Sequence, residues 1–395
     1  MWNKIFYNFY KRNQKKSFKK SFNHYQDISI SDFSEDNFSF SSINEYRQNV
    51  IVHRCVNIIA EAASHVPWII LKKENNNLVR SPSHPAELLL KHPNPRQGGA
   101  ELFTSVIANK LIYGNSFLLI IESDNVKELY VMNSQNIEAK IESGNLVGYL
   151  YNNSYKKDFF PIDPITQQSK ILHIKNYNPN SSDYFGISSL KAAALSIALY
   201  NKALEWNNNL LKNGGRPTGA LIVRDNVGYL SEKQFERLKE QLTEQYLGSK
   251  NVGKPLLLEG GIEWQEMSIN PKDMDFIQTK NSAARDIALA FGVPPHLLGI
   301  NGDSTYNNMQ EARVALWEET IIPLLDKIAD SLTTWFQYWY QEDIVVDFNR
   351  DAISALTHKQ ENLWAKINNA NFMTINEKRA IVGLVPIESG DVLQN

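Results

Sequence analysis

The chain has 395 residues, 43% of them hydrophobic, with 41 basic and 43 acidic side chains and a formal net charge of −2. This length suffices for one large elongated subunit or for two to three compact domains. The near-neutral balance argues against a whole surface built to hold nucleic acid tightly. The single cysteine, Cys55, excludes an internal disulfide framework and suits a reducing compartment. No apolar run reaches the length of a membrane span.

The first twenty residues carry seven Lys or Arg side chains and no acidic one. They lack the apolar core of a secretory signal, so the pattern indicates a basic disordered tail. A weak contact with an anionic surface is the alternative interpretation. The stretch that follows, to Ser42, is rich in Ser, Asn and Asp without a clear period and is typical of a linker. We therefore assign residues 1–44 to a tail and linker.

Residues 45–187 alternate between helical and strand-like patterns. The segment VIVHRCVNIIAEAASHVPWIILKK predicts a helix that ends at Pro67 and then a strand. Two further helical patterns are separated by the turn signal at His92–Pro95, and the apolar segments SFLLIIE and ILHIK predict buried strands. This mixture predicts an α+β domain.

Residues 188–213 predict one long helix with a serine N-cap and a Gly214-Gly215 stop. Four apolar side chains fall seven residues apart along it: Leu190, Ile197, Leu204 and Leu211. At 1.5 Å per residue such a helix spans about 37 Å. A heptad seam of this length favours packing against a neighbouring helix of the same chain or of the next one.

Residues 214–270 predict a small insert with a strand, a helix and a second strand, in GALIV, SEKQFERLKEQLTEQYL and PLLLE. A second helix is predicted in residues 271–298, with Ile277 and Ile287 on its apolar face. The double proline of Val293–Pro295 stops it, and a polar loop follows. A very long helix is then predicted from about Met309 to Tyr340, with a kink at Pro323, before a strand and a short helical tail.

One stretch, Gly248–Pro255, comes close to a phosphate-binding loop with the pattern GxxxxGK[ST]. Its last position is Pro255 where the Mg²⁺-holding hydroxyl belongs. A helix precedes it and a strand follows, which is the reverse of the order that points a helix N-terminus at the phosphates. A flexible basic turn is the favoured interpretation.

The remaining chemistry-bearing residues form no recognisable constellation. The triplet Gly302-Asp303-Ser304 resembles the start of some hydrolase signatures, but no base is suggested for the serine, so we interpret it as a turn and cap. The eight histidines are scattered without metal-ligand spacing. Asp273 and Asp275 are explained by the dipole of the helix that they begin. We predict no catalytic residue, no cofactor and no metal.

Taken in order, the segments resemble the portal, or head–tail connector, proteins of long-tailed bacteriophages, prophages and gene-transfer particles. The resemblance extends from about Val50 to Asp391. It is carried by VHRCVNIIAEAASHVPW, HPNP, LIYGNSFLLI, ILHIK with YFGISSLKAAALSIAL, NGGRPTGALIV, LSEKQFERLKEQL, GKPLLLEGGIEW, IALAFGVPPHLLGINGDSTYNNMQEA, IIPLLDKI and MTINEKRAIVGLVP. Each segment alone is weak, but ten in register form a strong signal.

The resemblance implies an α+β portal fold whose elongated subunits close into a ring, normally a dodecamer, at one capsid vertex of the virion. It implies a wing at residues 45–187, continued by a long helix and strand at 309–350. The stem would comprise a first helix at 188–213 and a second at 271–298, joined by a clip at 214–270. A short crown would occupy residues 351–395. The ring would have no catalysis of its own, and its implied partners are double-stranded DNA, the large terminase, the major capsid protein and a head–tail adaptor.

The same resemblance places a DNA-facing tunnel loop at residues 299–308. Its residues from 301 onward are Asn301, Gly302, Asp303, Ser304, Thr305, Tyr306, Asn307 and Asn308. None of them is basic, and each phosphate that a Lys or Arg neutralises adds affinity, so this loop can touch moving DNA without holding it. An ordinary surface connector is the alternative. The implied stem interface comprises Leu190, Ile197, Leu204, Leu211, Ile277 and Ile287.

Two functions of other classes stay open from the residues alone. A nucleotide hydrolase would use Gly248–Lys254, and a peripheral membrane adaptor would use the basic tail. Nucleotide-dependent stabilisation and binding to anionic vesicles, respectively, would distinguish them from the portal, which we favour.

Overall fold

The computed structural model describes residues 28–29, 39–40, 42–74, 77–123, 126–153, 156–180, 183–212, 219–223, 231–241, 262–266, 276–300, 306–370, 372–381 and 387–392. The chain divides into two compact units. The first comprises Met1–His53 with Leu190–Ala290, and the second comprises Arg54–Ser189 with Phe291–Asn395. Each unit is therefore discontinuous in sequence. Residues 190–290 belong to the first unit and interrupt the second, which resumes at Phe291.

The second unit contains three small antiparallel sheets. One has the order β13-β3-β4, from Ile344–Phe348, Trp68–Glu74 and Asn77–Arg80. Another has the order β10-β5-β6, from Ile171–Lys175, Asn115–Ser123 and Val126–Met132. The third is a meander, β7-β8-β9, from Ile137–Glu142, Asn145–Asn153 and Lys156–Pro161. The predicted strands WIILKK, SFLLIIE, ILHIK and DIVVDF are all present.

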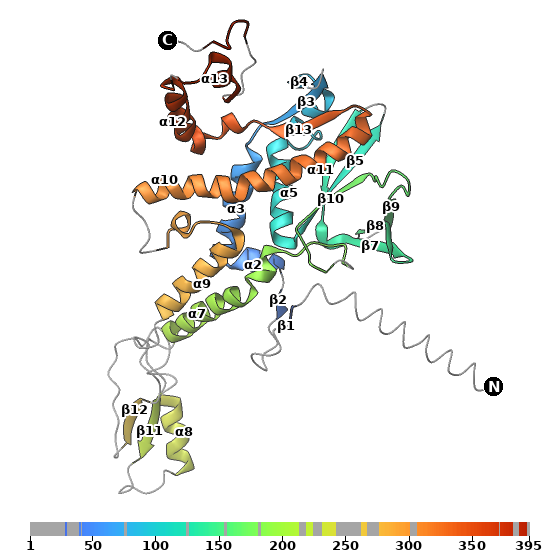
Figure 1. The fold of residues 1–395 in the computed structure, drawn as a ribbon. Helices are drawn as coiled ribbons and strands as arrows, with labels where there is room; N and C mark the ends of the chain where they lie inside the picture. The colour runs from blue at the N-terminus through green and yellow to red at the C-terminus, as the bar shows by residue number, and fades with distance from the viewer. Residues whose placement is uncertain are drawn as a thin grey trace, which may run out of the picture. The chain divides into compact units, whose positions relative to one another are not determined.

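Three helices pack on these sheets: α4 (Pro85–Lys91), α5 (Gly99–Tyr113) and α11 (Ile322–Tyr340). Helices α3 (Val50–Ser64) and α10 (Tyr306–Ala315) are also described. Helix α5 packs against β5, and α11 packs against β13 and β10 (Figure 1). Trp335 anchors α11: its ring is buried and its Nε1 donates to the Ser169 carbonyl at 2.9 Å. The apolar residues of α11, including Leu325, Ile328, Leu332 and Trp335, thus form its buried face.

The long helix is not α-helical throughout. Residues Leu316–Ile321 form a π-helical segment between α10 and α11, in which the N–H of Ile322 donates to the carbonyl of Trp317. Pro323 follows at once, and a proline in a helix leaves the carbonyl four residues earlier, here Glu319, without its usual donor and clashes with it. The widened turn accommodates that carbonyl. The kink predicted at Pro323 therefore takes the form of a local change in hydrogen bonding.

A hydrophobic core lies between the sheet β10-β5-β6 and the sheet β7-β8-β9. Phe117, Met132, Ile137, Tyr149 and Ile171 form a buried cluster that joins β5, β6, β7, β8 and β10. The chain ends in two short helices, α12 (Thr357–Asn368) and α13 (Ile375–Ile381). A capping box begins α13: Thr374 Oγ1 accepts from the N–H of Glu377, whose carboxylate accepts from the N–H of Thr374 at 2.8 Å.

The first unit is mainly helical. Helix α2 (Ser42–Gln48) leads into α3, and the predicted first stem helix is α6 (Ser189–Ala192) followed by α7 (Ala194–Lys212). The second stem helix is α9 (Phe276–Phe291). Helix α2 begins at Ser42, within the range 1–44 that the sequence pattern assigned to the tail and linker.

The predicted insert contributes β11 (Gly219–Val223), α8 (Glu232–Gln241) and β12 (Ile262–Glu266). Strand β11 pairs with β12 in antiparallel register, Leu221 opposite Trp264. The predicted strand PLLLE and the stretch Gly248–Pro255 lie outside the described residues. The strand that pairs with β11 is β12, which was not predicted from the sequence.

Candidate functional site

The corner that ends α9 is built on glycine. Gly292 has φ +69°, in the left-handed region, and its carbonyl accepts a hydrogen bond from Thr320 Oγ1 at 2.6 Å. A Cβ at this position would lie 2.6 Å from the same hydroxyl oxygen, so a side chain there would displace Thr320. Thr320 belongs to the π-helical segment, and the corner is therefore fixed to the long helix by one short hydrogen bond.

The chain then passes through a 3₁₀ turn, Pro295–Leu298, which ends at Gly299 with φ +70°. Val293 before the turn and Ile300 after it are buried. Two proline rings, two buried apolar side chains and two left-handed glycines define a rigid base. This base immediately precedes the loop that the family resemblance places against DNA.

The predicted tunnel loop is described only at its ends. Asn301, Gly302, Asp303, Ser304 and Thr305 lie outside the described residues. Tyr306, Asn307 and Asn308 form the first turn of α10, with Asn308 exposed, so the helix begins three residues before the predicted Met309. A contact between this loop and DNA stays a prediction.

The predicted stem seam divides between the inside and the outside of the chain. Leu190, Ile197 and Ile287 are fully buried within it and are not accessible to a second copy. Leu204 is 38% exposed and Ile277 74% exposed. The side chain of Leu211 lies outside the described residues. Leu190 on α6 and Ile197 on α7, the first two positions of the heptad, are therefore buried within the subunit.

Helices α7 and α9 run in opposite directions (Figure 1), and side-chain contacts join them in the first half of α7. Ser196 Oγ lies 3.5 Å from Asp286 Oδ2, and Lys280 Nζ lies 5.8 Å from the centre of the Tyr200 ring. The contacts pair Ser196 with Asp286 and Tyr200 with Lys280, so that moving forward along α7 corresponds to moving back along α9. The two helices therefore lie side by side in antiparallel orientation.

A buried polar cluster connects α7 to α2. Asn201 Nδ2 donates to Glu45 Oε2 at 2.9 Å, and Asn49 Nδ2 donates to Asn201 Oδ1 at 2.9 Å. The Asn49 side-chain oxygen also accepts from the N–H groups of Ile51 and Val52 and so caps α3. Burial raises the pKa of the Glu45 carboxyl, and the Asn201 hydrogen bond partly offsets this. Hydrogen bonds among Glu45, Asn49 and Asn201 thereby join α7 to α2 and to the first turn of α3.

A second polar cluster, centred on Asn115, lies in the second and larger unit. Its side-chain oxygen accepts from the N–H of Gly186 at 2.6 Å and is 2.9 Å from His173 Nε2. His173 Nδ1 lies 3.1 Å from the Tyr149 hydroxyl, and its ring stacks on Phe117 with centroids 4.3 Å apart. Burial lowers the pKa of His173 to about 3. The imidazole is therefore a neutral structural bridge between strands.

Lys110 is buried in the same unit and donates to the Asn176 side-chain oxygen. Burial lowers its pKa to about 8, with the nearby Lys327 acting in the same direction. Asn176 in turn donates to the carbonyls of Lys110 and Ile187. These contacts hold the end of α5 against the segment that contains Asn176 and Ile187. Lys110 therefore has a structural role.

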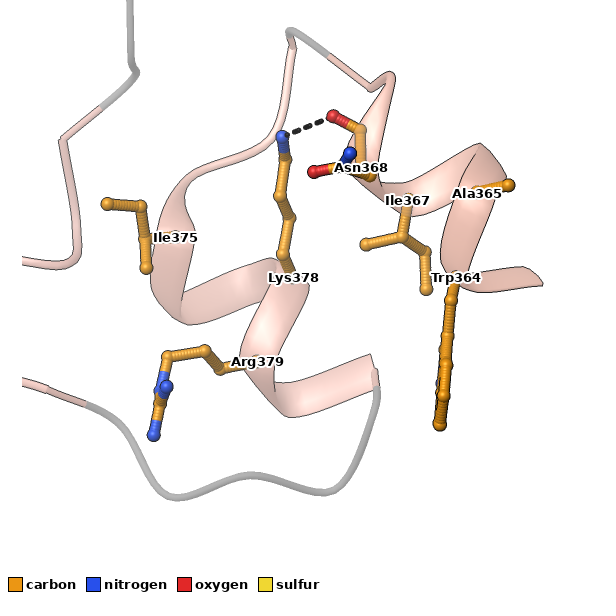
Figure 2. Close-up of a pocket in the computed structure, with 7 residues that line it drawn as sticks. All are labelled: Trp364, Ala365, Ile367, Asn368, Ile375, Lys378 and Arg379. Carbon is orange, nitrogen blue, oxygen red and sulfur yellow. Dashed lines mark hydrogen bonds between the residues drawn. The ribbon is translucent and has the colours of Figure 1, made fainter. Parts of the chain in front are cut away.

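An apolar groove of about 660 Å³ lies between α12 and α13. Figure 2 shows its lining, which consists of Trp364, Ala365, Ile367, Asn368, Ile375, Lys378 and Arg379. Lys378 donates to the Asn368 carbonyl at 3.3 Å. The lining has two cations and neither a carboxylate nor a nucleophile, so it offers no constellation for acid–base or covalent catalysis.

In the described part of the chain, no group of three or more His, Cys, Asp or Glu side chains is placed to hold a metal ion. None of the helices in the same ranges is long and apolar enough to cross a membrane. In the described residues, buried polar contacts join distant helices and strands.

Comparison with known proteins identifies the class. Residues 50–383 match the family model described as "Phage portal protein". This match covers most of the chain, so the protein belongs to the phage portal protein family, whose members are structural components of capsids and not enzymes. The sequence resemblance stated above is confirmed.

Three relatives make the relationship concrete. The portal protein of Enterobacteria phage HK97 is 24% identical over 366 residues, which cover 89% of this chain and 83% of that protein. A chain in the neck of an empty gene transfer agent (GTA) particle, computed with C6 symmetry, has a TM-score of 0.68 at 36% identity and covers 88% of this chain and 94% of that one. A chain in the neck of a native particle, computed with C12 symmetry, has a TM-score of 0.65 at 35% identity with the same coverage. The mixed helix-and-sheet fold is that of portal subunits.

Proposed function

We propose that twelve copies of this chain form the portal ring at one vertex of a phage-like or gene-transfer particle and conduct double-stranded DNA through the ring. The observation that carries this is the 35% identity, over 88% of the chain, with a subunit of a neck computed with C12 symmetry. The antiparallel helix pair α7–α9 supplies elongated elements suited to lining a ring. The ring acts as a conduit and an attachment point, without catalysis of its own.

The proposal includes the partners of such a ring. DNA enters through it, driven by a separate ATPase, the large terminase, without recognition of sequence. The major capsid protein surrounds the ring, and a head–tail adaptor binds it after packaging. Assembly takes place in the cytoplasm of the bacterial host. The near-neutral chain, with a net charge of −2, suits a passage that has to release the DNA it touches.

Residues 299–308 are proposed as the DNA-facing tunnel loop. Asn301–Asn308 contain one carboxylate and no basic side chain, so contacts with phosphates would be weak and would depend little on salt. The fixed corner at Gly292, the 3₁₀ turn and the buried Ile300 support this by giving the loop a stable base.

Electron microscopy of the purified protein tests the central proposal. Rings with an open centre, of a mass about twelve times the 45.2 kDa chain, are the expected result. A protein that stays monomeric at micromolar concentration, over a range of salt, would contradict it.

Shortening the loop separates assembly from DNA handling. Replacing Asn301–Asn307 by two glycines is expected to leave rings of normal size, because the corner at Gly292 and the helix pair are untouched and α10 loses only its first two residues. Packaged or retained DNA, measured as nuclease-resistant DNA per particle, is expected to fall at least tenfold. If the shortened protein forms no rings, the segment is a packing element and the tunnel-loop assignment is wrong.

A further inference from the structure

The groove between α12 and α13 is lined by one face of each helix. Residues three and four apart lie on the same face of a helix. Those that line the groove with this spacing are Trp364, Ile367 and Asn368 on α12 and Ile375, Lys378 and Arg379 on α13. The volume of about 660 Å³ falls in the range of about 300–1,000 Å³ that is typical of binding pockets.

The α12 side of the groove is apolar and open to a partner. Ile367 is buried at 9% exposure, whereas the neighbouring Trp364 ring is 55% exposed. Figure 2 shows both side chains on α12, with Lys378 reaching from α13 to the Asn368 carbonyl. Tryptophan is among the residues that contribute most to protein–protein binding, because its large ring loses much contact with water when a partner covers it. This ring is therefore the natural anchor point for an apolar side chain.

The two helices are held in place by polar contacts. Lys378 Nζ donates to the Asn368 carbonyl at 3.3 Å and so joins α13 to the last turn of α12. Asn376 Nδ2 donates to Asp391 Oδ1 at 2.8 Å, and the capping box at Thr374 orders the first turn of α13. Because these contacts form within the chain, a ligand does not have to order the walls of the groove when it binds.

The charge of the groove selects the kind of segment that fits it. A lysine ammonium has three N–H donors, and the Asn368 carbonyl takes one of those of Lys378. None of the described residues that line the groove is acidic. A purely apolar occupant would cover this ammonium without giving it a counter-charge, which is unfavourable. DNA phosphates can meet Lys378, but a stacked duplex leaves the Trp364 ring uncovered. A carboxylate beside an apolar side chain satisfies both requirements.

We propose that the groove between α12 and α13 binds an acidic segment of another protein, with an apolar side chain against Trp364 and Ile367 and a nearby carboxylate paired with Lys378. The groove is formed by a single chain, so the proposal does not depend on the ring. The mode of recognition is that of an amphipathic segment in a groove between helices. For a contact of this size we expect a Kd on the order of 10 µM.

Selection of a random dodecapeptide library by mRNA display on the full-length protein tests the specificity. The enriched peptides are expected to combine Leu, Ile, Phe or Trp with a nearby Asp or Glu. Selection on the variant Trp364→Lys, which places a charge on the apolar wall, is expected to lose these peptides. The proposal is wrong if no peptide is enriched over this variant, or if the enriched peptides lack acidic residues.

Fluorescence anisotropy with the most enriched peptide, labelled with fluorescein, measures the two contacts separately. Lys378→Gln keeps a donor for the Asn368 carbonyl and removes the charge, so it is expected to weaken binding at least fivefold and to reduce the dependence on salt. The control Lys366→Gln, at an exposed lysine of α12 outside the groove, is expected to bind like the parent. Equal affinities for these two variants would contradict a carboxylate partner.

The apolar contact has its own matched pair. Trp364→Ala is expected to weaken binding at least tenfold, whereas Leu363→Ala, at a leucine 45% exposed beside it and outside the lining, leaves the affinity unchanged. Thermal unfolding of each variant identifies any loss caused by misfolding. If Leu363→Ala weakens binding as much as Trp364→Ala does, the peptide lies elsewhere and the proposal fails.

Two competition measurements identify other occupants. A peptide that binds the monomer but is excluded from rings would show that a neighbouring copy covers the groove. A labelled DNA duplex that displaces the peptide and depends on Lys378 to the same extent would identify nucleic acid as the occupant. Either result would overturn the proposal. Rings seen by electron microscopy for the parent and for Trp364→Ala would leave the proposed function standing in both cases.

Discussion

Replacing Gly114 by alanine is expected to lower the free energy of unfolding by about 3–5 kcal/mol, one of the largest effects available in this chain. Gly114 ends α5 with φ +76°, where a residue with a Cβ is strained by about 1–2 kcal/mol. An added Cβ would also lie 2.5 Å from the Gly186 carbonyl oxygen and from the carbonyl carbon of Ile187. These obstacles are backbone atoms, so no side chain can rotate away.

Gly144 provides a matched control for the backbone cost alone. It has φ +85°, and an added Cβ there would meet nothing within 4 Å. Gly144→Ala is therefore expected to cost only about 1–2 kcal/mol. In a thermal melt of the larger unit, Gly114→Ala should lower the Tm by about 10 °C and Gly144→Ala by a few degrees. Equal shifts would mean that the approach of Gly186 to Gly114 is not what the position requires.

Much of the architecture was predictable because it depends on local patterns. Short apolar segments indicated β3, β5, β10, β11 and β13, and the helical period indicated the helices on either side of the insert. In the sequence, Gly292 and the double proline that follows it indicated where α9 ends. Even the disturbance at Pro323 was expected, since a proline cannot continue the hydrogen bonding of the helix that precedes it.

The contacts that join distant segments were not predictable in the same way. Asn115, His173 and Lys110 stand in the sequence as isolated polar residues, and only the fold brings them to Gly186, Tyr149 and Asn176. Of the heptad, Leu190 and Ile197 are buried within the chain and Leu204 is 38% exposed, and the spacing in the sequence could not distinguish a seam inside the subunit from one between subunits. That distinction depends on which side of α7 the chain itself covers.

Lowering the pH is expected to destabilise the larger unit through His173. Its pKa is about 3 in the folded protein, because burial disfavours the charged imidazole, whereas the pKa of a histidine in an unfolded chain is about 6.5. Between these values the unfolded chain binds a proton that the folded chain does not. The free energy of unfolding contributed by this group is therefore complete above about pH 6.5 and is lost progressively as the pH falls toward 3, by up to about 1.4 kcal/mol per pH unit.

The variant His173→Gln isolates this effect, since an amide can hydrogen-bond to Asn115 and Tyr149 but does not titrate. It is expected to be less stable than the parent at pH 7, because the ring also stacks on Phe117, yet to show a shallower decline in Tm between pH 6.5 and 4. His65→Gln, at an exposed histidine, should retain the steep decline of the parent. If His173→Gln declines as steeply as the parent, other groups set the acid sensitivity. A shallower curve in this variant alone would assign the sensitivity to the neutral imidazole bridge that holds the strands together.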